Sequence, residues 1–89
     1  MSVIELEGHL GPLDALELRR SLDTATAVQR PQVVVDMTRV QSVHPAVAAA
    51  VVRAARRARR GAGSLRLLEP TEPGADRMLQ LISLPQIVR

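Results

Sequence analysis

Residues 31–37 read PQVVVDM, and this stretch decides the fold. Its three consecutive valines are typical of a central strand that is buried on both faces, because β-branched side chains pack well on a pleated sheet. Strands of this kind usually belong to parallel or mixed sheets that helices cover. We therefore expect an internal strand here, with its carboxyl end at Asp36.

After this strand, the sequence predicts a helix over residues 45–60 and a short strand over residues 64–68. Pro45 suits the first helical position, because the amide that proline lacks would have no partner there. Gly61 and Gly63 suit the left-handed backbone that commonly ends a helix. The helix and the strand should therefore be joined by a tight turn.

Before the valine stretch, alternating apolar and polar residues predict a strand over residues 2–10, with a bend at Gly8. Asp14 and Glu17 have the three-residue spacing of a capping box, in which side chains bind the free amides of a helix N-terminus. We expect a helix that begins there and ends near Val28. Its expected apolar face consists of Leu16, Leu18, Leu22 and Ala25.

The loop 69–74 is dense in turn-forming residues, and a third helix is expected after it. Residues 84–88 are predicted to form a short terminal strand or coil. Strands and helices thus alternate along the chain, which favours a layered α/β domain. A chain of 89 residues can build one core only. We predict a single domain over residues 1–89, a small mixed β-sheet with about three helices packed on it.

Composition excludes several classes of protein. The chain has no cysteine, so disulfides and thiolate zinc sites are ruled out, and it has no aromatic residue that could stack on a base. Nucleic acid is therefore not an expected partner. The apolar runs are too short to span a bilayer and no basic-then-apolar leader is visible, so we expect a cytoplasmic location without membrane insertion.

Several short sequence motifs along the chain resemble those of the STAS domain, the fold of bacterial anti-sigma factor antagonists. Residues 33–40, VVVDMTRV, are similar to the central strand of that family, which has the form Val-Val-Leu-Asp-Leu-Ser-Gly-Val. Residues 8–11, GHLG, stand in place of the family's Gly-Glu-Leu-Asp. Residues 16–19, 69–70 and 75–84 resemble later family words. The resemblance covers nearly the whole chain, and it implies the STAS fold.

The phosphorylation motif of the family is not present at the corresponding positions of this chain. In STAS antagonists it reads Asp-Ser-Ser-Gly, and a partner kinase phosphorylates the first serine, whereas this chain has His44, Pro45, Ala46 and Val47. Pro45 occupies the acceptor position and has no hydroxyl group. We expect no phosphorylation there. We interpret Ser42 as a loop serine, and a phosphosite shifted to Ser42 is the alternative.

The resemblance implies a non-catalytic protein-interaction domain in the regulation of sigma-factor-dependent transcription. Without the acceptor serine, it is expected to be a constitutive binder or adaptor. The implied partner is an anti-sigma factor of the serine-kinase type, and the implied contact residues are Gly11, His44, Pro45, Ala46 and Val47. The alternative is an accessory STAS subunit of a bacterial lipid-transport ABC system, with its ATPase as partner. A homodimer is a third interpretation.

His9 and His44 fall on two family motifs whose elements are adjacent in the STAS fold, so we expect them at the same end of the domain. Three interpretations stay open for them: exposed loop residues, a pH-sensitive interface, or a metal pair that lacks a third ligand at diagnostic spacing. We expect no resident metal or other cofactor. No nucleophile elbow, phosphate loop or catalytic triad is visible, so we predict no enzymatic activity.

Arginines also form a stripe along the helix expected over residues 45–60. Arg53, Arg56, Arg57 and Arg60 have the spacing of one helical face. The simplest interpretation is a solvated outer face near the negative end of the helix dipole. A secondary basic surface that binds an acidic partner is the functional alternative.

Overall fold

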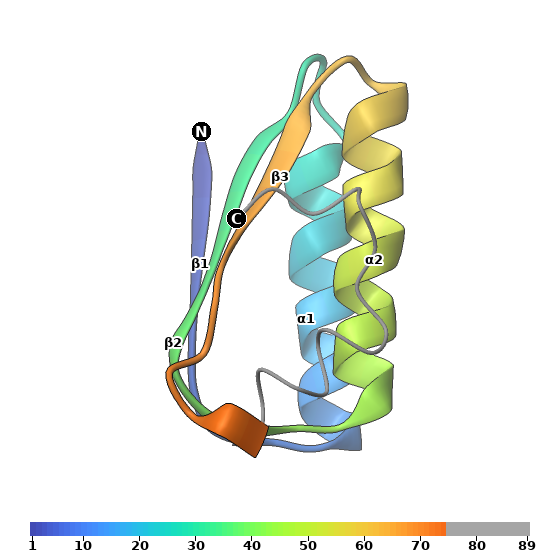
Figure 1. The fold of residues 1–89 in the computed structure, drawn as a ribbon. Coiled ribbons are helices and arrows are strands. Elements are labelled where there is room, and N and C mark those ends of the chain that lie inside the picture. Colours follow the sequence, from blue (N-terminus) through green and yellow to red (C-terminus); the bar gives the residue numbers. More distant parts are fainter. Residues whose placement is uncertain (75–89) are drawn as a thin grey trace.

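The computed structural model describes residues 1–74. In chain order its elements are β1 (Ser2–Leu10), α1 (Pro12–Thr26), β2 (Gln32–Val43), α2 (Pro45–Arg60) and β3 (Ser64–Leu68). The strands form one sheet in the order β1-β2-β3, and both neighbouring pairs are parallel. Both helices lie on the same face of this sheet (Figure 1). The predicted α/β class is confirmed.

The direction of the strands differs from the prediction, and the predicted C-terminal elements are not described. The sheet was expected to be mixed, and its three described strands are parallel. The third helix and the terminal strand expected at residues 84–88 lie outside the described residues. Within residues 1–74, no helix is long and apolar enough to cross a membrane.

β2 is the central strand, as predicted, but it is not buried on both faces. Val33, Val35 and Met37 are fully buried under the helices, whereas Val34 and Asp36 are half-buried on the opposite face. The two helices cover one face only, so burial alternates along the strand. The strand also continues past Asp36 to Val43, because its ladder with β1 resumes after irregularities in register.

The predicted bend at Gly8 coincides with one of these irregularities. The register between β1 and β2 shifts between Gly8 and His9, and Gly8 has a φ of 78°. Residues with a Cβ rarely adopt this backbone conformation, so glycine suits the position. The shift gives β2 one extra residue, which is the definition of a β-bulge.

α1 begins earlier than predicted. Gly11 is its N-cap, Pro12 is the first helical residue and Asp14 is the third, with its carboxylate accepting a hydrogen bond from the amide of Gly11 at 2.7 Å. Asp14 therefore stabilises the helix start from inside the first turn, whereas the capping-box prediction placed the helix start at Asp14 itself. The helix ends at Thr26 rather than near Val28.

The buried face of α1 also differs from the prediction. Its fully buried members are Ala15, Leu18, Leu22 and Thr26. Leu16 was expected on this face, but half of its surface is exposed, and Ala25 is half-buried. The cause is helical geometry, because at 3.6 residues per turn Leu16 lies on nearly the opposite side of α1 from Leu18.

α2 spans the predicted residues and packs through small side chains. Its buried members are Val47, Ala48, Val51, Val52, Ala54, Ala55 and Ala58. Alanine and valine allow the helix to approach the sheet closely, which suits a core without aromatic residues. An ion pair between Arg57 and Asp23, at 2.6 Å, joins α2 to α1.

Candidate docking surface

Both helices start at the same end of the sheet (Figure 1). Leu10 and Val43, the last residues of β1 and β2, are register partners. The amide of His44 donates to the carbonyl oxygen of Leu10 at 2.9 Å. This hydrogen bond joins the residues that precede the two helices. In parallel α/β sheets, ligands and partners commonly bind at the carboxyl ends of the strands, where helix N-termini converge.

His44 is the N-cap of α2, and its Nδ1 accepts a hydrogen bond from the amide of Ala46 at 3.1 Å. An acceptor nitrogen carries no proton, so this cap requires the neutral imidazole tautomer with the proton on Nε2. The first turn of α2 contains no acidic residue, in contrast to that of α1, which has Asp14. The positive end of the α2 dipole is therefore not compensated by a carboxylate of its own first turn.

The residues implied by the family resemblance divide into two groups. His44, Pro45 and Ala46 are exposed and Gly11 is half-buried, so these four residues form a surface at the start of the helices. Val47 is fully buried among the core residues. Its side chain does not reach the surface and serves to anchor α2 on the sheet.

A groove of about 330 Å³ continues from this surface between α1 and α2. It is lined by Pro12, Ala15, Leu16, Arg19, Ala46, Ala49, Ala50 and Arg53. Leu16 is 50% exposed, and the neighbouring Leu13 is 79% exposed. This groove was not predicted, because Leu16 was expected on the buried face of the helix. The repeated spacing of small residues on both helices is the signal that could have revealed it.

The model of the family described as "Mlab, STAS domain" matches residues 1–89. The chain belongs to the STAS domain family. A search of curated proteins gives no match. STAS domains are in general binding domains that mediate protein–protein interaction.

The STAS motif position at the start of α2 is built differently in this chain. Pro45 stands where the family resemblance places the acceptor serine, and Ser42 is the hydroxyl nearest to it in sequence. Ser42 lies in β2 rather than in a loop, as the sequence analysis had assumed. Its Oγ is 2.7 Å from Nδ1 of His9 on the neighbouring strand, and both side chains are exposed.

His9 and His44 lie at the same end of the STAS domain, as predicted, because they occupy the carboxyl ends of β1 and β2. Their Nδ1 atoms have different partners, namely Ser42 for His9 and the amide of Ala46 for His44. Among residues 1–74, no group of three or more His, Cys, Asp or Glu residues has the arrangement of a metal site.

The predicted arginine stripe is divided by the packing of the helices. Arg53, Arg56 and Arg60 are exposed, whereas Arg57 is half-buried and pairs with Asp23. Arg53 also lines the groove, together with Arg19 of α1. The stripe therefore contains one arginine that joins the helices, one that faces the groove and two that lie farther along α2.

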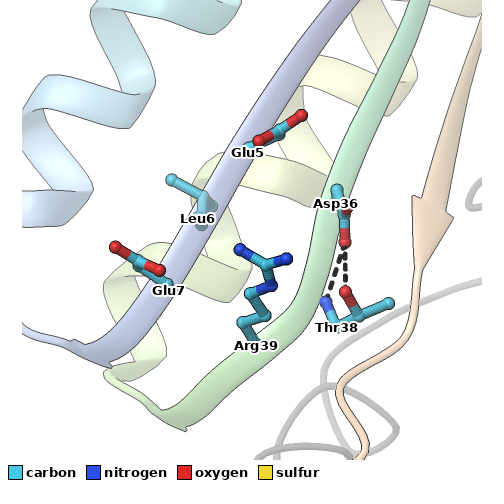
Figure 2. A pocket seen from close by; sticks show the side chains of 6 residues that line it. All are labelled: Glu5, Leu6, Glu7, Asp36, Thr38 and Arg39. Atoms are coloured by element: carbon cyan, nitrogen blue, oxygen red, sulfur yellow. Dashed lines mark hydrogen bonds between the residues drawn. The ribbon is translucent and has the colours of Figure 1, made fainter.

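A second hollow, of about 360 Å³, lies on β1 and β2 (Figure 2). It is lined by Glu5, Leu6, Glu7, Asp36, Thr38 and Arg39. One oxygen of Asp36 accepts hydrogen bonds from the amide of Thr38 at 2.9 Å and from its hydroxyl group at 2.7 Å. The backbone hydrogen bond from Thr38, the hydroxyl of Thr38 and the charge of Arg39 lower the pKa of Asp36.

This arrangement has a structural explanation. Between Glu5 and Glu7 of β1, the register on β2 advances from Asp36 to Arg39, so β2 contains an extra residue there. A bulge leaves an amide without its ladder partner, and the Asp36 carboxylate satisfies the amide of Thr38. We therefore interpret this carboxylate as a support of the bulge.

Proposed function

We propose that this STAS domain acts by docking to a protein partner, without catalysis, through the surface of Gly11, His44, Pro45 and Ala46 and the adjoining groove. The observation that supports the proposal most strongly is the exposed small and apolar surface at the start of α2, continuous with half-exposed Leu16. Apolar surface rimmed by polar residues is typical of protein interaction sites.

The proposed partner is an anti-sigma factor of the kinase type, and the proposed role is regulation of sigma-factor-dependent transcription in the bacterial cytoplasm. Pro45 at the motif position supports constitutive binding, because it has no hydroxyl group for a phosphate to occupy. A phosphate at this point would add close to two negative charges at a helix N-terminus and alter the docking surface.

Binding is tested with an affinity pull-down from the native lysate, with and without ATP, read by mass spectrometry. Ala46→Glu adds a bulky charge at an exposed position and should abolish retention of the partner. Ala27→Glu makes the same change at an exposed residue after α1 and should leave retention intact. Equal retention by folded Ala46→Glu would refute this surface.

Constitutive binding is tested by incubation with the retained kinase and radiolabelled ATP. No phosphate should enter the chain. Incorporation would refute this part of the proposal, and its loss in Ser42→Ala would assign the phosphate to β2.

The second candidate is an accessory subunit that docks on the ATPase of a bacterial lipid-transport ABC system. The description of the matching family supports this second candidate, because that description names Mlab beside the STAS domain and names no sigma-factor system. Recovery of a transporter ATPase in the pull-down, with permease and substrate-binding genes beside the coding sequence, would favour this candidate. A kinase-fold anti-sigma factor would favour the first.

A further inference from the structure

The groove between α1 and α2 has the same pattern on each wall. The four residues from each helix have the spacing i, i+3, i+4 and i+7, and the last residue is an arginine on both. The residues on α1 are Pro12, Ala15, Leu16 and Arg19, and those on α2 are Ala46, Ala49, Ala50 and Arg53. This spacing places each set along one side of its helix.

The two arginines lie at the same end of the groove. Both helices start beside the same hydrogen bond, between His44 and Leu10, and both follow strands that run in parallel. Seven residues of α-helix extend about 10 Å along its axis. Arg19 and Arg53 therefore stand at the same level, about two turns from the helix starts, and the stretch before them is apolar.

Charge around the groove has one sign. Within the described part of the chain, its lining contains two arginines and no carboxylate. Neither arginine takes part in the ion pair found within residues 1–74, which joins Arg57 to Asp23. Asp23 lies one turn beyond Arg19 on α1, but its carboxylate pairs with Arg57. Asp14 and Glu17 of α1 line a separate hollow toward β1. An occupant of the groove would meet positive charge that the neighbouring side chains do not neutralise.

We infer that this groove binds an amphipathic helix of a protein partner, whose apolar ridge covers Leu16 and the alanines and whose carboxylates pair with Arg19 and Arg53. This inference rests on the proposed function, because it names the chemistry of the partner at that same surface. An elongated groove between two helices suits a third helix, whose side-chain ridge can enter it. The small alanine side chains leave room for that ridge.

The same features of the groove fit a lipid bilayer less well than a protein helix. Arginines beside apolar residues also attract anionic lipid, but segments that lie in a membrane interface typically present large apolar residues such as tryptophan and phenylalanine. This chain has no aromatic residue, and most apolar groove residues are alanines. The hollow shape and small side chains fit a protein surface better than a lipid layer.

The experiment is a selection from a displayed library of amphipathic helical peptides, with the purified full chain immobilised. The selected peptides should have apolar residues at helical spacing and an excess of Asp and Glu at one end. Arg19→Glu with Arg53→Glu should weaken their binding about tenfold or more, because it removes two attractions and adds two repulsions. Peptides with Lys in place of the acidic residues should bind this variant better than wild type.

The matched control is Arg56→Glu with Arg60→Glu. It makes the same change in net charge at two exposed arginines of α2 that do not line the groove. This control should weaken binding much less, by about twofold. Ala49→Glu places a bulky charge on the α2 wall of the groove, one turn before Arg53, and should abolish binding.

Four results of the binding experiments would overturn the inference, and a fifth comes from light scattering. The four are recovery of no peptide, recovery of peptides without acidic excess, equal weakening by the two arginine pairs, and binding to phosphatidylglycerol vesicles that the groove variants alone abolish. A concentration-dependent dimer in light scattering that Ala49→Glu abolishes would also overturn it, in favour of a second copy of this chain.

Failure of the proposed function has a different signature. In that case the lysate pull-down retains no protein that Ala46→Glu releases. If a partner is retained and Ala46→Glu releases it, but reversal of Arg19 and Arg53 has no effect, the docking surface stands and only the acidic helix is refuted.

Discussion

Gly63 lies directly against Pro31, so closely that a Cβ on Gly63 would come within 1.9 Å of the carbonyl oxygen of Pro31. The same carbonyl oxygen accepts a hydrogen bond from the amide of Ser64 at 2.8 Å. Pro31 is itself fully buried. The contact joins the segment before β2 to the segment before β3 and aligns the start of their pairing.

Gly63→Ala should therefore destabilise the domain, because the clash is with backbone atoms that cannot rotate away. Overpacking of this kind costs about 3 kcal/mol, which lowers Tm by more than about 10 °C in a domain of this size. Thermal and chemical unfolding followed by circular dichroism measure the effect. Gly74→Ala is the control, since among residues 1–74 nothing lies within 4 Å of a Cβ at that position. Equal stability of the two variants would contradict the contact.

The N-cap of α2 provides a second prediction. His44→Ala removes the acceptor for the Ala46 amide and should cost about 1 kcal/mol of stability. His44→Asp should be more stable than His44→Ala, because it restores an acceptor and places a negative charge at a helix start that has no acidic residue. Urea unfolding at pH 7 measures both changes. If His44→Asp proves less stable than His44→Ala, the capping geometry is wrong.

Asp36 predicts a pH dependence of stability. The hydrogen bonds from Thr38 lower its folded-state pKa below the unfolded value, so the ionised form stabilises the fold above that unfolded value and the contribution is lost as the pH falls through the folded pKa. This contribution of Asp36 to stability is lost in the pH range below about 4. Asp36→Asn should lower Tm at pH 7 and reduce the further loss of Tm between pH 5 and pH 2.

The control for this prediction is Glu5→Gln, which removes a carboxylate from the same hollow but leaves both Thr38 hydrogen bonds intact. It should keep the acid dependence that Asp36 contributes. If Asp36→Asn loses as much Tm between pH 5 and pH 2 as the wild type does, the bulge does not depend on the charge of this carboxylate.

The ion pair between Asp23 and Arg57 should contribute modestly. Asp23 is 43% exposed and Arg57 is 33% exposed, so water and salt screen the attraction. Arg57→Ala should cost about 0.5 kcal/mol at low ionic strength, and less in 1 M salt. A double-mutant cycle with Asp23→Ala isolates the pair. A coupling free energy of zero at low salt would mean that the contact does not stabilise the packing of α1 on α2.

Local patterns were sufficient for most of the secondary structure. The strand at residues 2–10, the helix at residues 45–60 and the strand at residues 64–68 all match the prediction. Alternation and proline at a helix start act within a few residues of the chain, so they can be recognised without the fold. The end of α2 was predicted, but the left-handed residue after it is Ala62, with a φ of 60°, whereas Gly61 has a φ of −87°. The start of α1 was wrong because the prediction rested on the spacing of Asp14 and Glu17, whereas Pro12 is the local signal of the true start.

The sequence by itself determined the α/β class and the STAS resemblance. Both depend on the order of the elements and on short motifs of consecutive residues. The groove was decided only by the tertiary structure. Its walls come from α1 and α2, and its arginines, Arg19 and Arg53, are brought level by a hydrogen bond between the ends of two strands. Helical periodicity separates Leu16 from Leu18 by nearly half a turn, but it does not specify that the side of α1 with Leu16 borders α2 and forms a groove there.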